Sequence, residues 1–269
     1  MNKLKFEKLD KTALDNPLNE LADTLREEYN RRVDSVTREL ESIYEENNGE
    51  INFNEFYGTI KYYGLIQVIK SKFNELKGIN ETNLQPFFEK VYDEGFEGFK
   101  DILGVDINKD LEKRTQALER PIAGATTSER LEKHNNDLQF GAVAATIGSI
   151  QDGNNYIQTK GLLKEEVGKY YNKTMNIAET KGHKLIEQSK LNAAEQSVGD
   201  KTGEVELMKI WVSVGDEKVR AAHETLNGTK IPVDEDFISP AGGKGPAPGL
   251  MNNAGDDINC RCWLNYELV

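Results

Sequence analysis

Two segments carry the strongest structural signals in the chain: KIWVSVGDEKVRAAHETLNGTKIPVDEDF, residues 209–237, and DDINCRCWLNYELV, residues 256–269. Residues 210–214 are mostly β-branched or aromatic, which is typical of a short strand. Asp216 is a suitable N-cap for a following helix, and Gly228 can adopt the left-handed conformation that ends one. The pattern therefore predicts a strand, a capped helix, a loop and a closing strand.

Polar side chains gather on this predicted helix and on the closing strand. Counting from Asp216, helical spacing places Arg220 at i+4 and His223 at i+7, on one face. Cys260 and Cys262 are the two cysteines of the chain. Thiolate, imidazole and carboxylate groups are all ligands that zinc accepts. The candidate metal set is Asp216, His223, Cys260 and Cys262.

Two other interpretations of these residues stay open. The cysteines could be small buried residues on the core-facing side of the closing strand, with Arg261 on the other side. Asp216, Arg220 and His223 could form a polar network that fixes the surrounding loops. A catalytic interpretation needs His223 as general base, Asp216 or Asp257 to orient it, and a nucleophile such as a cysteine. His183 could join the cluster if its helix packs beneath it.

The same residues carry a resemblance to a known family. The pattern W-x4-D-x3-R-x2-H-x2-L-x-G, a variable Gly/Pro loop and then N-C-R-C resembles the phage Mu F-like minor head protein family. The resemblance extends over the C-terminal part of the chain, including the upstream helix that contains AETKGHKLIEQSKLNAAEQ. The matching positions are Trp211, Asp216, Arg220, His223, Leu226, Gly228, Asn259, Cys260, Arg261 and Cys262.

The resemblance implies a structural minor protein of a tailed-phage head, involved in head morphogenesis and associated with the portal and with DNA packaging or delivery. Its implied location is the head interior of the virion, after synthesis in the host cytoplasm. Its implied partners are the portal protein and the scaffold or major capsid protein. We expect no enzyme activity and no cofactor, with zinc as the open alternative. The competing function is a metal-dependent hydrolase that uses His223 with Cys260 and Cys262. Some family members carry a toxin domain after this region, and we expect none after Val269.

Charge limits the classes of partner. The chain has 269 residues and a formal net charge of −12, which argues against a general nucleic-acid coat because such binding rests on clustered Lys and Arg. Lysines do recur over residues 160–190, but they are interleaved with glutamates. This pattern predicts a mixed solvated face and weak or no direct DNA binding. The lysines are Lys160, Lys164, Lys169, Lys173, Lys181, Lys184 and Lys190.

The rest of the chain predicts a mainly α protein with a small α+β C-terminal module, that is, long helices plus a short antiparallel sheet. The predicted domains are a helical N-terminal domain at 1–152 and a Mu F-like module at 153–269, separated by a polar Gly-containing break. A proline at position 17 marks the expected start of the first long helix. The expected helices lie near 17–48, 54–76, 84–103, 108–118 and 162–197, and the expected strands at 209–214, 230–233 and 261–268.

Two segments have unusual composition. Residues 138–150, LQFGAVAATIGSI, carry no charge and are too few to span a bilayer, so we expect a small-residue helix packed closely against another helix rather than a membrane contact. Residues 238–257 are rich in Gly and Pro but lack the context of a phosphate-binding loop. We expect this loop to be either a contact arm or a segment that becomes ordered only on assembly.

Overall fold

The computed structural model describes residues 2–122, 124–199 and 207–269. The chain forms two compact units, and each is assembled from segments that are separated in the sequence. These units do not coincide with the predicted domains 1–152 and 153–269, because the break after residue 151 is a turn between two helices of the same unit. Unit 1 consists of residues 1–20, 85–127 and 176–269, and unit 2 of residues 21–84 and 128–175.

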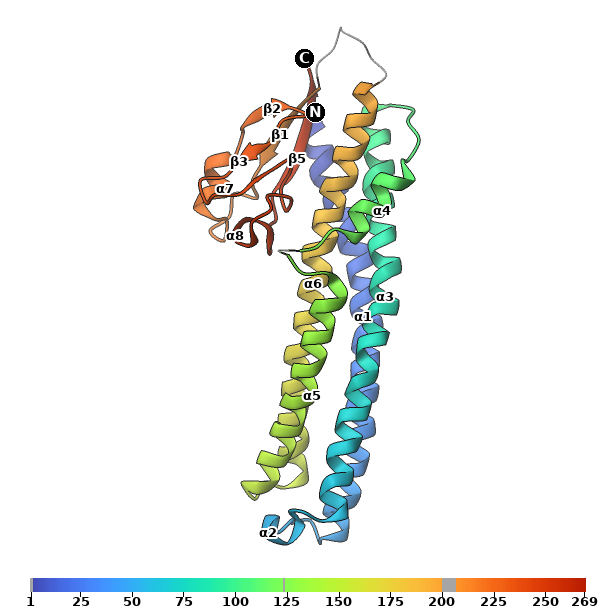
Figure 1. Ribbon diagram of the computed structural model, residues 1–269, viewed down its shortest axis with the longest axis vertical. Helices are drawn as coiled ribbons and strands as arrows, with labels where there is room; N and C mark the ends of the chain where they lie inside the picture. The colour runs from blue at the N-terminus through green and yellow to red at the C-terminus, as the bar shows by residue number, and fades with distance from the viewer. Residues whose placement is uncertain (1, 123, 200–206) are drawn as a thin grey trace. The chain divides into compact units, whose positions relative to one another are not determined.

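The secondary structure is mainly helical with short antiparallel strands, which confirms the predicted fold class (Figure 1). The helices are α1 (Asn2–Glu46), α2 (Phe53–Phe56), α3 (Ile60–Leu103), α4 (Leu111–Glu119), α5 (Thr127–Gln151), α6 (Tyr156–Gly199), α7 (Ala221–Leu226) and α8 (Ala254–Asp257). The strands are β1 (Leu207–Val212), β2 (Lys230–Pro232), β3 (Phe237–Ile238), β4 (Lys244–Gly245) and β5 (Trp263–Leu268).

Two helices are longer than the prolines in them predict. Pro17 was expected to begin a helix and lies inside α1, and Pro86 lies inside α3. A proline within a helix removes one backbone hydrogen bond and strains the preceding turn. Buried apolar side chains continue on both sides of each proline, for example Ala13 and Leu21 around Pro17. The burial of this apolar face offsets the lost hydrogen bond, and the helices continue.

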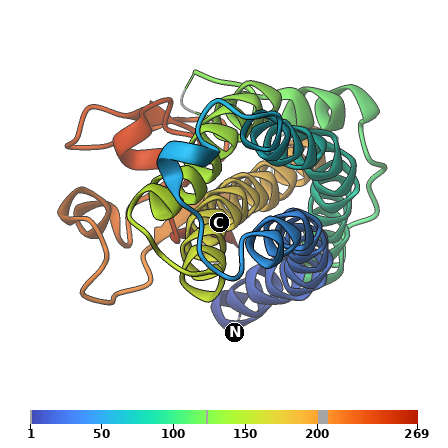
Figure 2. The ribbon, with the colours of Figure 1, turned by 90° about the horizontal axis from the view of Figure 1, so that it is seen from below.

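Unit 2 is built from segments of α1, α3, α5 and α6 with the short α2 at one end. Figure 2 looks along these helices and shows the segments grouped side by side. Their shared core contains much of the predicted seam of the first helix, with Val36 and Leu40 fully buried. The apolar spacing of three and four residues therefore predicted this packing face correctly.

The uncharged segment 138–150 forms the second half of α5. Its predicted close packing against another helix is confirmed at Gly141, where a Cβ atom would lie 2.5 Å from a Glu166 oxygen and 3.1 Å from the Tyr170 hydroxyl of α6. A larger residue at this position would require the Glu166 carboxylate to move. No helix in the described part of the chain combines the length and apolar character needed to cross a membrane.

Unit 1 contains a three-stranded antiparallel sheet in the order β2-β1-β5, which confirms the three predicted strands. β1 pairs with β5 over its whole length, with Leu207 opposite Leu268 and Val212 opposite Trp263. β5 lies along α6 (Figure 1), because a Glu187 carboxylate oxygen accepts a hydrogen bond of 2.9 Å from the Leu264 amide. The sheet is thus fixed to the helix by a buried charged group.

The Gly/Pro-rich loop differs from its prediction as a contact arm. Residues 238–257 include β4, part of β3 and α8, and they contribute Ala247, Leu250 and Met251 to the core of unit 1. At Gly245 an added Cβ would lie only 1.9 Å from the Leu250 carbonyl oxygen. Gly and Pro therefore serve close backbone packing here, and the loop is an integral part of the core.

The lysines of residues 160–190 are also not all on a solvated face. Lys181 and Lys184 are buried, and their ammonium groups donate to the carbonyls of Leu118 and Pro121 at 2.5 and 3.0 Å. Lys190 is fully buried beside Glu187, with 2.5 Å between nitrogen and oxygen. The prediction of a mixed solvated face is wrong for these three residues, because their long side chains cap carbonyls that would otherwise be buried without a partner.

Candidate functional site

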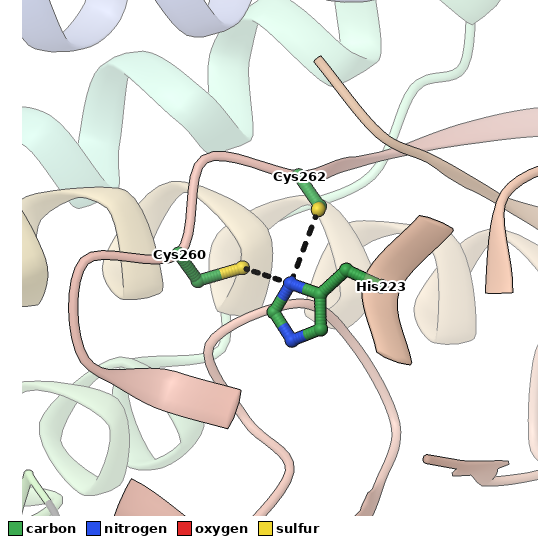
Figure 3. Close-up of side chains that lie close together, drawn as sticks. All are labelled: His223, Cys260 and Cys262. Atoms are coloured by element: carbon green, nitrogen blue, oxygen red, sulfur yellow. Dashed lines mark hydrogen bonds between the residues drawn. The ribbon is translucent and has the colours of Figure 1, made fainter. Parts of the chain in front are cut away.

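Three buried side chains of unit 1 bring their donor atoms to one point. His223 lies on α7, and Cys260 and Cys262 precede β5 (Figure 3). The His223 Nδ1 atom lies 3.7 Å from the Cys260 sulfur and 3.4 Å from the Cys262 sulfur. The three ligand atoms all lie within 4.8 Å of one another. The structure therefore brings together three of the four residues of the candidate metal set.

The other face of the His223 ring is held by a buried carboxylate. Its Nε2 atom lies 3.2 Å from Asp256 Oδ1, and the same oxygen accepts a hydrogen bond of 2.9 Å from the Ser239 hydroxyl. An ionised carboxylate only accepts, so the proton of a neutral His223 ring lies on Nε2. The Nδ1 lone pair then points toward the two sulfurs.

Packing fixes the position of the ring as well. Trp211, which is fully buried on β1, meets the His223 ring edge to face with 5.4 Å between ring centres. On its far side Trp211 contacts the ring of Phe237 at 5.3 Å. The tryptophan of the family-like motif therefore works as a wall of the site, and it leaves the imidazole little freedom to rotate.

The site shifts the proton affinities of all three groups. A hydrogen bond with Cys262, together with burial, raises the pKa of Cys260 to about 11, and the same bond lowers the pKa of Cys262. Burial acts to lower the pKa of His223, but the Cys260 thiol and the Asp256 carboxylate outweigh it and the net pKa is raised. The two thiols therefore differ in character, and Cys262 is the readier to become a thiolate.

The structure does not bring Asp216 to this group. Asp216 is partly exposed and forms a bidentate ion pair with Arg261. The two guanidinium nitrogens lie 2.6 and 2.7 Å from the two carboxylate oxygens. Arg220 donates to the Ile258 carbonyl instead. Asp216, Arg220 and His223 thus each have a partner in residues 256–262, and these bonds join the two halves of the motif.

The predicted helix that starts at Asp216 is wrong in its beginning. Residues 216–219 form a turn, in which the Asp216 side chain accepts from the Lys218 amide at 3.0 Å, and α7 begins only at Ala221. Asp216 and His223 therefore do not share a helix face. The local bond of an aspartate to the amide two residues ahead is a common competitor of helix capping. The predicted end at Gly228 is confirmed by its positive φ of 81°.

Two residues of the site were not predicted from the sequence. Asp256 and Ser239 lie in the segment that was expected to be an arm, so their burial beside His223 had no signal in the sequence pattern. His183 was named only as a conditional member. It is buried on α6, and its ring lies beside Cys260, where it acts to lower the pKa of that thiol.

The fold and the site together define a class: a helical chain whose C-terminal sheet is closed by a Trp/Asp/Arg/His segment bonded to an N-C-R-C segment. Residues 143–265 match the family described as phage Mu protein F like protein. This match and the similarity reported next confirm the predicted resemblance to the phage Mu F-like family.

Similarity to curated proteins extends beyond this region. The chain is 29% identical to Minor head protein GP7 of Bacillus phage SPP1, over 97% of this chain and 86% of that protein. It is also 27% identical, over 53% of its length, to NAD(+)–arginine ADP-ribosyltransferase EFV of Enterococcus faecalis, where the match spans only 28% of that protein. No solved structure matches the chain.

Proposed function

We propose that this chain is a structural, non-catalytic minor protein of a phage head, which acts in head morphogenesis through contacts with the portal protein. The observation that carries the proposal is the similarity to a minor head protein over nearly the full length of both chains. The similarity to the ADP-ribosyltransferase covers about a quarter of that enzyme, so it supports a shared region rather than a shared reaction.

The geometry of the cysteine site supports a structural role. Cys260 and Cys262 are 4% and 2% exposed, and His223 is 2% exposed. A nucleophile or general base must reach a substrate within hydrogen-bond distance, and these atoms face one another inside the core. The hydrolase alternative would require the surrounding loop to open, although that loop is packed into the core of unit 1.

An exposed apolar group on unit 2 supports a role based on protein contacts. Ile60 is 92% exposed, and Tyr57 and Tyr63 are each more than half exposed. Tyr57 and Tyr63 both contact Tyr62, with ring centres 5.0 and 5.2 Å away, so the three tyrosines form one aromatic surface. Exposed apolar surface of this kind commonly marks a contact site between proteins. We assign this aromatic surface to contact with the portal protein.

The test is made in the phage. Procapsids and virions are purified from cells carrying the normal gene, a deletion, and a variant with Tyr57→Ser, Ile60→Ser and Tyr63→Ser. We expect the chain in normal particles, and reduced incorporation of the folded triple variant. A matched control is Phe140→Ser, which removes another exposed apolar side chain of unit 2. Absence of the normal chain from both kinds of particle would contradict the proposal, and normal incorporation of the triple variant would contradict the assigned surface.

Direct DNA binding is expected to be weak. Three of the seven lysines of the candidate basic segment are buried, so fewer cations face solvent than the sequence suggests. A fluorescence anisotropy titration on random-sequence duplex at physiological salt measures the affinity. We expect a Kd no tighter than the ~10⁻⁴–10⁻⁶ M of non-specific contacts. Nanomolar binding would place DNA among the direct partners and contradict a role exercised through protein contacts alone.

A further inference from the structure

The distances among His223, Cys260 and Cys262 fit a metal ion better than they fit hydrogen bonds. Zinc binds sulfur and nitrogen at bond lengths that place a sulfur and a nitrogen of one tetrahedral site about 3.6 Å apart. The measured distances from His223 Nδ1 to the two sulfurs are 3.7 and 3.4 Å, on either side of that value. The three atoms point toward one another (Figure 3) and lie close enough together for one zinc ion to bind all of them.

Hydrogen bonding alone leaves this arrangement incomplete. A neutral imidazole nitrogen offers either one proton or one lone pair, yet both sulfurs face the same Nδ1 atom. The Asp256 carboxylate holds the ring proton on Nε2 and leaves Nδ1 free to act as a ligand. A carboxylate that orients a metal-binding histidine in this way is a regular feature of zinc sites.

A fourth donor is available on α6. His183 is 92% buried, being 8% exposed, and its Nε2 atom has no hydrogen-bond partner among the described residues. Its ring lies beside the Cys260 sulfur. His183 is not among the three side chains whose ligand atoms lie within 4.8 Å of one another, so its ring must move toward the sulfurs to complete a site.

We propose that Cys260, Cys262 and His223 bind one zinc ion through their two sulfurs and Nδ1, and that His183 closes the site as the fourth ligand. Each cysteine binds as a thiolate and releases its proton to solvent when it is still protonated. Four protein ligands leave no open position for a substrate, so the ion is structural. It ties α6, α7 and the segment before β5 together.

The first measurement uses the full chain as it is purified. Elemental analysis after dialysis against zinc and then against metal-free buffer is expected to give one zinc per chain. Cobalt(II) added to the metal-free chain is expected to give the near-ultraviolet charge-transfer band of thiolate ligands and the intense visible bands of four-coordinate cobalt. This spectrum needs no substitution, so it tests the site even if the variants fold poorly. Absence of bound zinc together with a spectrum of six-coordinate cobalt would overturn the proposal.

Conservative variants assign the ligands. Cys260→Ser, Cys262→Ser and His223→Gln are each expected to lose stoichiometric zinc. His134→Gln, which changes the remaining histidine of the chain in unit 2, is the matched control and is expected to keep it. Retention of full zinc binding by both cysteine variants would overturn the site.

His183→Gln tests the fourth position. We expect the variant to bind zinc at least ten-fold more weakly, measured by competition with a chelator of known affinity, and its cobalt spectrum to shift toward a solvent-exposed ligand. Unchanged affinity and an unchanged spectrum would overturn the assignment of His183. Folding of each variant is checked by circular dichroism. The outcome does not depend on incorporation into phage heads, so it is independent of the proposed function.

Discussion

The two units differ in the polar groups that their cores contain. In the described part of unit 2, every buried polar residue is neutral, and these residues are Thr37, Asn80, Asn135, Thr146, Ser149, Thr159 and Thr174. In the described part of unit 1, nine buried residues are lysine, histidine, glutamate or aspartate, namely Lys181, His183, Lys184, Glu187, Lys190, Lys209, His223, Asp256 and Asp257. One core is held by apolar packing and hydroxyl bonds, and the other contains charges.

The neutral core works through short side chains that satisfy one another. The Tyr29 hydroxyl lies 3.0 Å from the Thr174 hydroxyl and accepts a bond of 3.1 Å from Asn80. In the charged core, long side chains donate hydrogen bonds to backbone carbonyls. Lys209, for example, donates to the Val233 carbonyl at 2.8 Å. A buried charge that loses its partner costs far more than a buried hydroxyl. We therefore expect the stability of unit 1 to depend strongly on pH and on every buried charge keeping its partner. The stability of unit 2 should depend mainly on apolar packing.

The largest effect is expected from breaking the buried ion pair of unit 1. Lys190→Met leaves Glu187 without the ammonium 2.5 Å from its carboxylate, and loss of one partner of a buried pair costs about 3–5 kcal/mol. Both tryptophans, Trp211 and Trp263, belong to unit 1, so urea denaturation followed by tryptophan fluorescence reports this unit. Lys164→Met, an exposed lysine of the same helix, is the control and is expected to change stability by less than ~0.5 kcal/mol. Equal stability of the two variants would contradict the claim that unit 1 depends on its buried charges.

A core truncation in unit 2 is expected to cost somewhat less. Leu40 is fully buried in the helical core, and Leu→Ala substitutions at such sites cost about 2–5 kcal/mol. Far-ultraviolet circular dichroism, which senses the helices of both units, should show the loss. Tryptophan fluorescence should show a smaller shift in midpoint. Coincident shifts by both probes would mean that the two units unfold together. The cores would then still differ in composition, but the units would not differ in stability.

Between pH 7.5 and 9.5, we expect unit 1 to become more stable as the pH rises. Burial lowers the pKa of Lys209 from 10.5 to about 8. Between these two values the folded state binds fewer protons than the unfolded chain, so the free energy of unfolding rises with pH, by up to about 1.4 kcal/mol per pH unit. Urea denaturation at several values from pH 7.5 to 9.5 measures the slope by tryptophan fluorescence. Lys209→Met should remove the contribution of this group, and an unchanged slope in that variant would contradict the prediction.

The smallest effect is expected in the neutral network of unit 2. Tyr29→Phe removes the hydroxyl that bonds to Thr174 and Asn80, which costs about 1–2 kcal/mol. The exposed Tyr63→Phe is the matched control and should leave stability unchanged. The difference between the two variants should be the same at pH 6 and pH 8, because the partners are neutral. A difference that varies with pH would show that charge does reach this core.

Regular apolar spacing made most of unit 2 predictable. Leu25, Val36 and Leu40 follow a helical period, and nothing in their surroundings competes with that pattern. The helix boundaries at Pro17 and Pro86 were not predictable, because tertiary burial decides whether a proline ends a helix. The three strands of the sheet were predicted within a few residues from β-branched and aromatic runs.

The residue types of the site in unit 1 could be predicted from the sequence, but which residues contact one another could not. His223, Cys260 and Cys262 were grouped by chemistry alone, and the fold brings them together. Asp216 was grouped with them on an assumed helix that a local turn replaces. The carboxylate that orients His223 is Asp256, which follows a loop whose glycines and prolines suggested an arm. The partner of His223 is set by contacts between residues far apart in the sequence, and these contacts cannot be predicted from local composition.

The discontinuity of unit 1 sets an order of folding during synthesis. Unit 2 is complete once residue 175 has left the ribosome, whereas unit 1 joins residues 1–20 to a segment that begins at residue 176. Chains emerge from the N-terminus at about 5–20 residues per second, so the first residues of α1 wait roughly 8–30 s for the segment that begins at residue 176. During that interval the apolar face of this segment is open to chaperones or to neighbouring nascent chains. The group of His223, Cys260 and Cys262 can form only after residue 262 has been made, so this part of unit 1 closes late in folding.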